Sequence, residues 1–142
     1  MTVEFKWNGE ALKRKMFAAQ KFGIDKTMAE AVTHAKNNHT WKNRTGTLEG
    51  SVKIIEYGAK DLDGVAGTWG SADVVYALIQ ELGGTIVPVK AKMLMFKVDG
   101  ETRFAHSVTI PARPYLRPAA AAIYPRLAAN IKAGARREGI GP

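Results

Sequence analysis

Prolines and glycines between positions 83 and 118 restrict the backbone of this chain more than any other sequence feature. The pair Gly83-Gly84 follows an apolar segment and can take positive φ, so it predicts a tight turn that redirects the chain. Prolines at 111, 114 and 118 fix their own φ and bias the preceding residue away from helical geometry. We therefore expect residues 111–118 to form an ordered, extended entry into a C-terminal helix.

Two apolar stripes at helical spacing predict a long N-terminal helix. The first stripe consists of Leu12, Met16 and Ala19, and the second of Ile24, Met28, Ala31, Val32 and Ala35. Asn8 is a suitable N-cap, and the predicted helix runs from about residue 8 to residue 38. Gly23 lies between the stripes and costs about 1 kcal/mol relative to Ala in a helix interior, so it predicts a kink or a break.

Strand signals follow this helix. Residues 37–40 and 43–46 read as a loop. Residues 50–56 and 65–69 then predict two strands joined by a turn at 61–64. The imperfect alternation in the first strand predicts cover on both of its faces. We expect the two strands to form a hairpin.

A second hairpin is predicted around Asp99-Gly100, because Asp-Gly is among the strongest short hairpin signals. It would join residues 93–98 to residues 102–110 and pair Met95 with Phe104. Leu94 and Phe96 would line the other face, so we expect one face to meet a helix and the other a neighbouring subunit. Residues 74–82 fit a helix or a strand, and the apolar spacing favours a short helix.

The C-terminal part is alanine-rich and predicts a helix over about residues 115–133, with Ile123, Leu127 and Ile131 on one face. Pro125 should kink or divide it, and residues 134–142 should form a mobile tail. The expected fold is α+β: an antiparallel β-sheet, in the region of about 50–110, packs against the long N-terminal helix, with a short middle helix and a C-terminal helix.

Composition supports one domain over residues 1–142, because 46% hydrophobic content is enough for one core. The absence of cysteine excludes disulfides, thiolate metal sites and cysteine nucleophiles. A net charge of +8 raises the alternative of a small basic nucleic-acid-binding module. The basic residues are spread along the chain, however, which favours solvated helix faces and contacts with acidic protein neighbours.

The sequence predicts no catalytic, cofactor-binding or metal-binding residues. His34 and His39 are five positions apart, which aligns them poorly on a helix, and His106 has no evident ligand partner. The acidic segment at 61–64 lacks the later carboxylates of a calcium loop. There is no nucleophile-elbow serine and no phosphate-binding loop. We therefore expect a non-enzymatic protein without a cofactor.

The order of several short motifs resembles the neck or tail-completion proteins of long-tailed bacteriophages, which join head to tail. The matching motifs are Thr45-Gly46 with Leu48 and Ser51-Val52, Tyr76-Ala77 with Glu81, Gly83-Gly84-Thr85, residues 90–96, and Ala112-Arg113-Pro114-Tyr115-Leu116-Arg117-Pro118-Ala119. With the long helix they cover most of the chain.

The resemblance implies a structural virion protein that assembles with copies of itself into a ring. The ring would lie between the connector, or stopper, and the tail terminator at the head-tail junction, with genomic DNA passing nearby. The N-terminus has no secretory signal and no stretch could span a membrane, so we expect a soluble protein of the host cytoplasm before assembly. A tail terminator or another minor tail protein is the related alternative.

The resemblance and the segment 111–118 together give candidate assembly contacts. They are Glu81, Lys90, Lys92, Arg113, Tyr115 and Arg117. Glu81 could pair with Arg113 or a basic neighbour, or lie on the solvated side of a short helix. The prolines would hold Arg113 and Arg117 in directions that suit bidentate contacts with carboxylates, or the two could merely cover apolar surface. Trp7, Trp41 and Trp69 are expected to fill a core or a groove.

Overall fold

The computed structural model describes residues 1–42, 45–62 and 64–141 and confirms the α+β fold. In chain order the elements are α1 (Gly9–Asn37), α2 (Thr47–Ser51), β1 (Val52–Asp61), β2 (Gly64–Ser71), α3 (Ala77–Leu82), β3 (Gly84–Ile86), β4 (Leu94–Val98), β5 (Glu101–Ala105), β6 (Val108–Ile110), α4 (Leu116–Ile123), a 3-10 turn (Tyr124–Arg126) and α5 (Leu127–Arg137). The predicted loop at 43–46 and turn at 61–64 include positions 43, 44 and 63, which lie outside the described residues.

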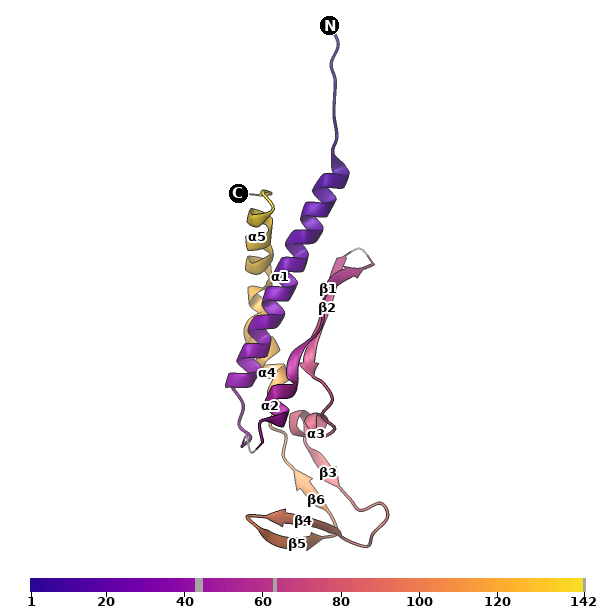
Figure 1. Ribbon diagram of the computed structural model, residues 1–142, viewed down its shortest axis with the longest axis vertical. Coiled ribbons are helices and arrows are strands. Elements are labelled where there is room, and N and C mark those ends of the chain that lie inside the picture. Colours follow the sequence, from indigo (N-terminus) through magenta and orange to yellow (C-terminus); the bar gives the residue numbers. More distant parts are fainter. Residues whose placement is uncertain (43–44, 63, 142) are drawn as a thin grey trace.

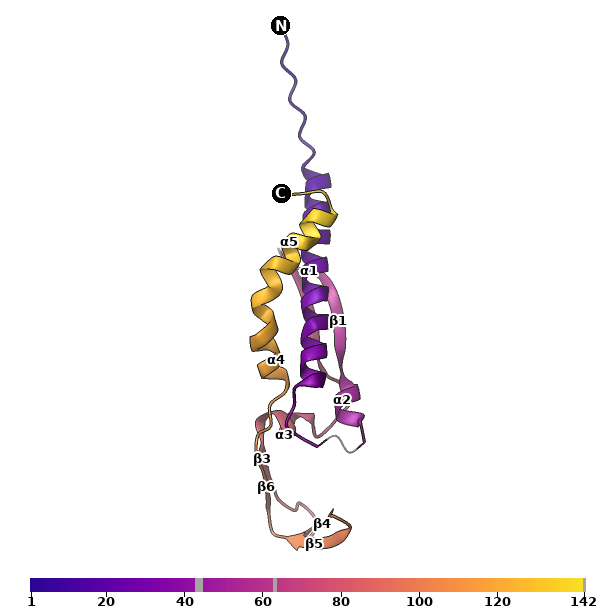
Figure 2. The same cartoon turned by 90° about the vertical axis from the view of Figure 1, so that its left-hand side faces the viewer.

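The helix α1 forms the middle layer of an elongated molecule. The helices α4 and α5 pack on one side of it and the β1–β2 ribbon packs on the other (Figure 1). A view turned by 90° shows the same order of layers (Figure 2). Beyond the C-terminal end of α1 follow α3, the β3–β6 ribbon and the β4–β5 ribbon, while residues 1–8, the N-terminal arm, extend from the opposite end.

The prediction of one long N-terminal helix is confirmed, but the kink or break predicted at Gly23 is wrong. The helix α1 is continuous from Gly9 to Asn37. Gly23 instead permits a close helix crossing, because a Cβ at this position would lie 2.7 Å from the Cα of Ile131 in α5. Gly134 of α5 is equally close to α1, since its Cβ would lie 2.6 Å from the carbonyl oxygen of Ala19. Two glycines therefore set the distance between these helices.

The two apolar stripes of α1 differ in burial. In the second stripe, Met28, Ala31 and Ala35 are buried under α4, α5 and the β1–β2 ribbon. In the first stripe only Ala19 is buried, while Leu12 and Met16 are exposed. The first turns of α1 extend past α5 and the β1–β2 ribbon (Figure 1), and the tip of that ribbon meets Met16 only across an open hollow.

The strands in the described residues form three separate two-stranded antiparallel ribbons, β1–β2, β3–β6 and β4–β5. The β1–β2 hairpin is confirmed and is longer than predicted, with two register shifts. Cover on both faces of β1 was wrong, because α1 packs on one face and leaves Ile55 and Tyr57 exposed. The first residues of the predicted strand at 50–56 belong to α2, which the sequence analysis did not predict.

The hairpin at Asp99-Gly100 is confirmed, and Met95 pairs with Phe104 as expected. The predicted strand at 102–110 is divided, however, because β5 pairs with β4 whereas β6 pairs with β3. The prediction that a helix covers one face of this hairpin is also wrong for the described residues. Met95 and Phe104 are exposed, and the ribbon projects from the end of the molecule (Figure 1).

The division of the C-terminal helix at Pro125 is confirmed, since a 3-10 turn over Tyr124–Arg126 separates α4 from α5. The predicted helix end at residue 133 is wrong. The helix α5 continues to Arg137, because Gly134 packs on Ala19 and the Arg137 guanidinium lies 4.4 Å from the centre of the Phe22 ring. The expected tail therefore begins after Arg137.

Candidate assembly interface

A small core anchors the junction between the helical layers and the projecting ribbons. Tyr115 is fully buried and meets the Trp41 ring edge-on at a centroid distance of 4.4 Å. Its hydroxyl lies 2.6 Å from Ser71 Oγ in β2. His39 stacks on Trp41, with the two ring centroids 3.7 Å apart. Residues from α1, α2, β1, α3 and α4 complete this core, namely Ala35, Leu48, Val52, Ala77 and Ala119.

The Glu81 carboxylate joins α3 to the N-terminus of α4. It accepts hydrogen bonds from the backbone N–H groups of Tyr115 at 2.7 Å, Leu116 at 3.0 Å and Arg117 at 2.8 Å. These N–H groups have no partner within the helix, and a negative charge is favourable at this helix end. The expected pairing with Arg113 and the solvated position were therefore wrong for Glu81, whereas a contact with a basic residue of a neighbour stays a prediction.

Burial raises the pKa of the Tyr115 hydroxyl above its ordinary value, and the nearby Glu81 carboxylate and Tyr76 add to the rise, while the hydrogen bond with Ser71 opposes it. As a candidate assembly contact Tyr115 was wrong, because no part of its side chain reaches the surface. Its ring holds residues 111–115 in place from within. The prediction of an extended backbone as far as residue 118 was wrong, because α4 already begins at Leu116. Part of the motif at 112–119 therefore specifies packing within the chain rather than a contact with a partner.

Arg113 is exposed, and its backbone N–H donates to the Gln80 carbonyl oxygen at 2.8 Å. It lines a hollow of about 420 Å³ on the surface. The other lining residues are Trp41, Lys42, Thr45, Leu48, Tyr76 and Gln80. The Trp41 Nε1–H and the Gln80 Oε1 are buried and have no hydrogen-bond partner among the described residues. The hollow therefore combines the cationic side chains of Lys42 and Arg113, which suit a carboxylate.

An exposed apolar surface continues from this hollow. The stripe that predicted a short helix faces outward, since Val75 is 100% exposed and Leu78 is 69% exposed. Other exposed apolar residues on α3 and the following segment are Tyr76, Leu82, Ile86, Val87 and Val89. We call residues 75–89 the apolar face. Exposed apolar residues gathered in one segment are typical of surfaces that contact other molecules.

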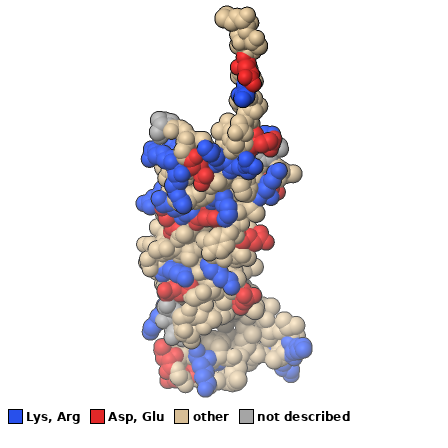
Figure 3. All heavy atoms as spheres, turned by 45° about the horizontal axis from the view of Figure 1, so that its top comes forward, with Lys and Arg blue, Asp and Glu red and all other residues tan. Residues whose placement is uncertain are grey.

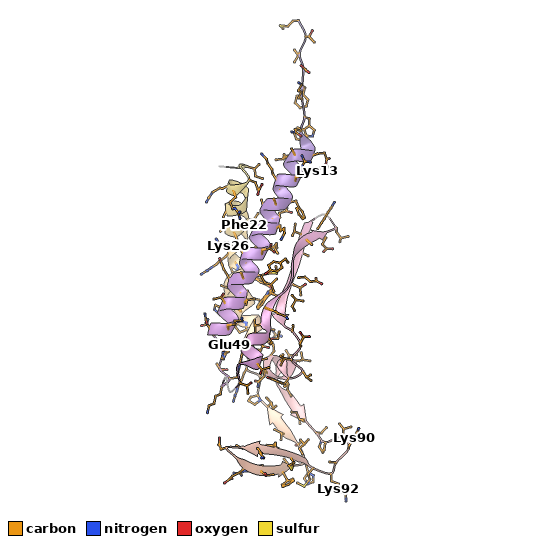
Figure 4. The ribbon with its side chains drawn as sticks, in the orientation of Figure 1. Lys13, Phe22, Lys26, Glu49, Lys90 and Lys92 are labelled. Atoms are coloured by element: carbon orange, nitrogen blue, oxygen red, sulfur yellow. The ribbon has the colours of Figure 1, made fainter. Side chains whose placement is uncertain are left out.

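Lys90, Lys92 and Arg117 are exposed, as candidate contacts require. Lys90 and Lys92 lie in the segment between β3 and β4, at the opposite end of the molecule from Lys13 (Figure 4). Arg117 lies in the first turn of α4. Of the six candidate residues, these three and Arg113 therefore remain available to a partner, whereas Glu81 and Tyr115 are engaged within the chain.

The three tryptophans have different environments. Trp41 is buried in the core, and Trp69 packs against it with its Nε1–H bonded to Tyr124 Oη at 3.0 Å. Trp7 is exposed in the N-terminal arm, so a place in the chain's own core was wrong for this residue.

The described ranges contain no group of three or more His, Cys, Asp or Glu side chains that could hold a metal ion. In the same ranges, none of the helices is long and apolar enough to cross a membrane. No protein-family model, curated protein or solved structure matches this chain.

Proposed function

We propose that this protein is a structural virion protein of a tailed phage that joins head to tail, and that copies of it assemble into a ring between the connector and the tail. The observation that carries the proposal is the apolar face beside the hollow of Arg113. Burial of apolar surface contributes about 25 cal/mol per Å², so this face favours association with another protein surface.

Ring assembly needs two different surfaces on each subunit, one of which meets the other surface on the next subunit. The apolar face and the projecting β4–β5 ribbon lie at the end of the molecule opposite the N-terminal arm (Figure 1). The two ends therefore present different residues to a neighbour. The order of motifs that resembles the tail-completion proteins supports the assignment of this assembly to the head-tail junction.

The hollow of Arg113 supports an acidic contact within that assembly. A Glu or Asp side chain of a neighbour would receive hydrogen bonds from the Arg113 guanidinium group and would lie near Lys42. The basic charge of the chain also favours acidic neighbours over a second basic surface.

Electron microscopy of purified particles with this protein labelled, beside particles from a deletion of its gene, tests the proposal. We expect label at the head-tail junction, and separate heads and tails in the deletion. Label at the distal end of the tail, or joined and infectious particles without the protein, would contradict it. A terminator role would instead give tails of abnormal length in the deletion.

Nucleic-acid binding is a second candidate, favoured by the distribution of charge. Lys and Arg side chains gather over the end of the molecule where α1 and α5 lie side by side, with acidic side chains among them (Figure 3). Lys13, Arg14 and Lys15 lie in the second turn of α1, and Arg136 and Arg137 end α5. DNA affinity that falls steeply with salt, with a slope that reports several phosphate contacts, would favour this function.

A further inference from the structure

The N-terminal arm has the pattern of a β-strand. Val3, Phe5 and Trp7 are 86%, 85% and 75% exposed, and they alternate with the polar residues Thr2, Glu4 and Lys6. Alternation with period two places the apolar side chains on one face of an extended chain and the polar ones on the other. The ion pair between Glu4 and Lys6, at 3.7 Å, agrees with this arrangement.

The arm extends away from the rest of its own chain (Figure 1, Figure 2). Its three large apolar side chains are therefore mostly exposed to water, although burial of apolar surface is favourable. An extended segment with one apolar face and free backbone groups is the form that adds to the edge of an existing sheet.

The strand β4 offers a matching edge. It is paired with β5 on one side, and its other edge has no partner strand among the described residues. Leu94, Phe96 and Val98 alternate along it with Met95 and Lys97, so β4 has the same period and the same length as Val3–Trp7. A two-stranded ribbon is marginally stable by itself, and a third strand would stabilise it.

We propose that the N-terminal arm of one copy of this protein adds to the outer edge of β4 in a second copy, antiparallel to that strand. When Phe5 is placed opposite Phe96, Trp7 lies opposite Leu94 and Val3 lies opposite Val98. The three apolar pairs then share one face of a three-stranded sheet.

The charges of Glu4, Lys6 and Lys97 favour an antiparallel direction of the arm relative to β4. In this register Glu4 lies opposite Lys97, which is a favourable cross-strand pair. A parallel strand centred on the same residue would place Lys6 opposite Lys97, and like charges directly opposite each other are unfavourable. Lys97 would protect the edge of β4 in the free protein, and Glu4 would neutralise it in the complex.

The second copy is required by the shape of the molecule. The arm and β4 lie at opposite ends of one chain, so the arm cannot reach its own β4 (Figure 1). A contact between the arm of one copy and the far end of the next is heterologous, and it forms a ring where the rotation between successive copies closes. The inference rests on the self-assembly in the proposed function, but it does not depend on the position of the ring in the virion.

Reversing the charge at positions 4 and 97 of the purified full-length protein tests the proposed register of the arm on β4. We expect Glu4→Lys and Lys97→Glu each to reduce self-association in sedimentation experiments, and the double variant to restore it. Lys60→Glu is the matched control, because Lys60 is exposed on β1 and belongs to neither strand of the proposed contact, so it should leave association unchanged. Association that is unchanged in both single variants, or a wild-type protein that remains monomeric at every concentration, would overturn the proposal.

Disulfide cross-linking tests the edge. Because the chain has no cysteine, introduced thiols are the only ones present. We expect E4C mixed with K97C to form linked dimers, and we expect loss of this product when K97C is replaced by T102C on the other strand or by M95C. Equal linkage to T102C would overturn the proposal. If particles join normally while the arm does not link to β4, only this inference fails and the proposed function stands.

Discussion

Glu81 and Tyr115 show at the scale of single residues how α3, α4 and β2 are held together. The Glu81 carboxylate accepts hydrogen bonds from three successive N–H groups that lie 34 to 36 positions further along the chain. Tyr115 contributes the first of these N–H groups and also bonds to Ser71 through its hydroxyl. The motif around Glu81 and the motif around Tyr115 are thus joined by hydrogen bonds.

We expect Glu81→Gln to lower the free energy of unfolding by about 2 kcal/mol, because hydrogen bonds to a charged group contribute more than neutral ones. Chemical denaturation followed by circular dichroism measures the change. Glu101→Gln is the control, since its carboxylate is exposed and pairs only with Arg103 among the described residues, and it should change stability little. Equal effects of the two variants would argue against the role of Glu81.

The raised pKa of Tyr115 predicts that the stability of the protein depends on pH in the alkaline range. Its pKa is raised in the folded protein mainly by burial, so the unfolded chain ionises first, at its ordinary value of about 10. The stabilisation is fully present below that pH and is lost as the pH rises through the folded-state pKa, where the folded protein binds more protons than the unfolded chain. We expect the unfolding free energy to fall over this range.

Tyr115→Phe should remove this part of the pH dependence, at a constant cost of about 1 kcal/mol for the lost hydrogen bond to Ser71. Denaturation curves at several pH values compare the variant with wild type. Tyr57→Phe is the control, because Tyr57 is exposed. The prediction fails if the Phe variant keeps the slope of the wild-type protein.

At the scale of elements, the crossing of α1 and α5 depends on glycine. Glycine lowers helix propensity, and from sequence alone Gly23 was therefore interpreted as a weak point of α1. In the fold it lies against Ile131, while Thr27 accepts a hydrogen bond from the buried Asn130 amide at 2.9 Å. The close crossing thus combines backbone approach with a buried polar pair.

We expect Gly23→Ala to destabilise the protein by about 1–3 kcal/mol, although Ala is the better helix former, because the added Cβ would overlap the backbone of Ile131. Gly50→Ala is the matched control. It also lies in a helix, has nothing within 4 Å of an added Cβ, and should be neutral or slightly stabilising. Thermal unfolding measures both. A stabilised Gly23→Ala variant would contradict the crossing.

At the scale of the whole molecule, apolar surface is left exposed at both ends. The apolar face and the β4–β5 ribbon occupy one end, and the N-terminal arm occupies the other. The exposed residues at the two ends take no part in the packing of α4, α5 and the β1–β2 ribbon on α1. Association with other subunits is therefore the physical reason that we infer for them.

We expect Leu78→Ser to weaken self-association without loss of stability, because the Leu78 side chain is mostly exposed in the free chain. Analytical ultracentrifugation over a range of concentrations measures the association, and thermal unfolding measures the stability. Ala77→Ser, at a buried neighbouring position, should show the opposite pattern. Unchanged association of the Leu78 variant would remove the apolar face from the interface.

Arg113→Glu should reduce ring formation and particle joining, because a negative charge in the hollow would repel the carboxylate of a neighbour. Lys15→Glu makes the same change in charge on an exposed part of α1 and serves as the control. Complementation of the gene deletion with each variant measures joining. Normal joining and normal self-association of the Arg113 variant would remove this residue from the proposed contacts.

By itself the sequence determined much of the local structure of this protein, though not α2 or the division of the strand predicted at 102–110. Helical periodicity, Asp-Gly at a hairpin and Pro125 in a helix act over a few residues, so the long helix, the hairpins and the divided C-terminal helix could be predicted. Only the tertiary structure decided which candidate residues are available. The partners of Glu81, the burial of Tyr115, the use of Gly23 and the exposure of the α3 stripe depend on segments far apart in the chain, and local spacing carries no information about which of those segments meet.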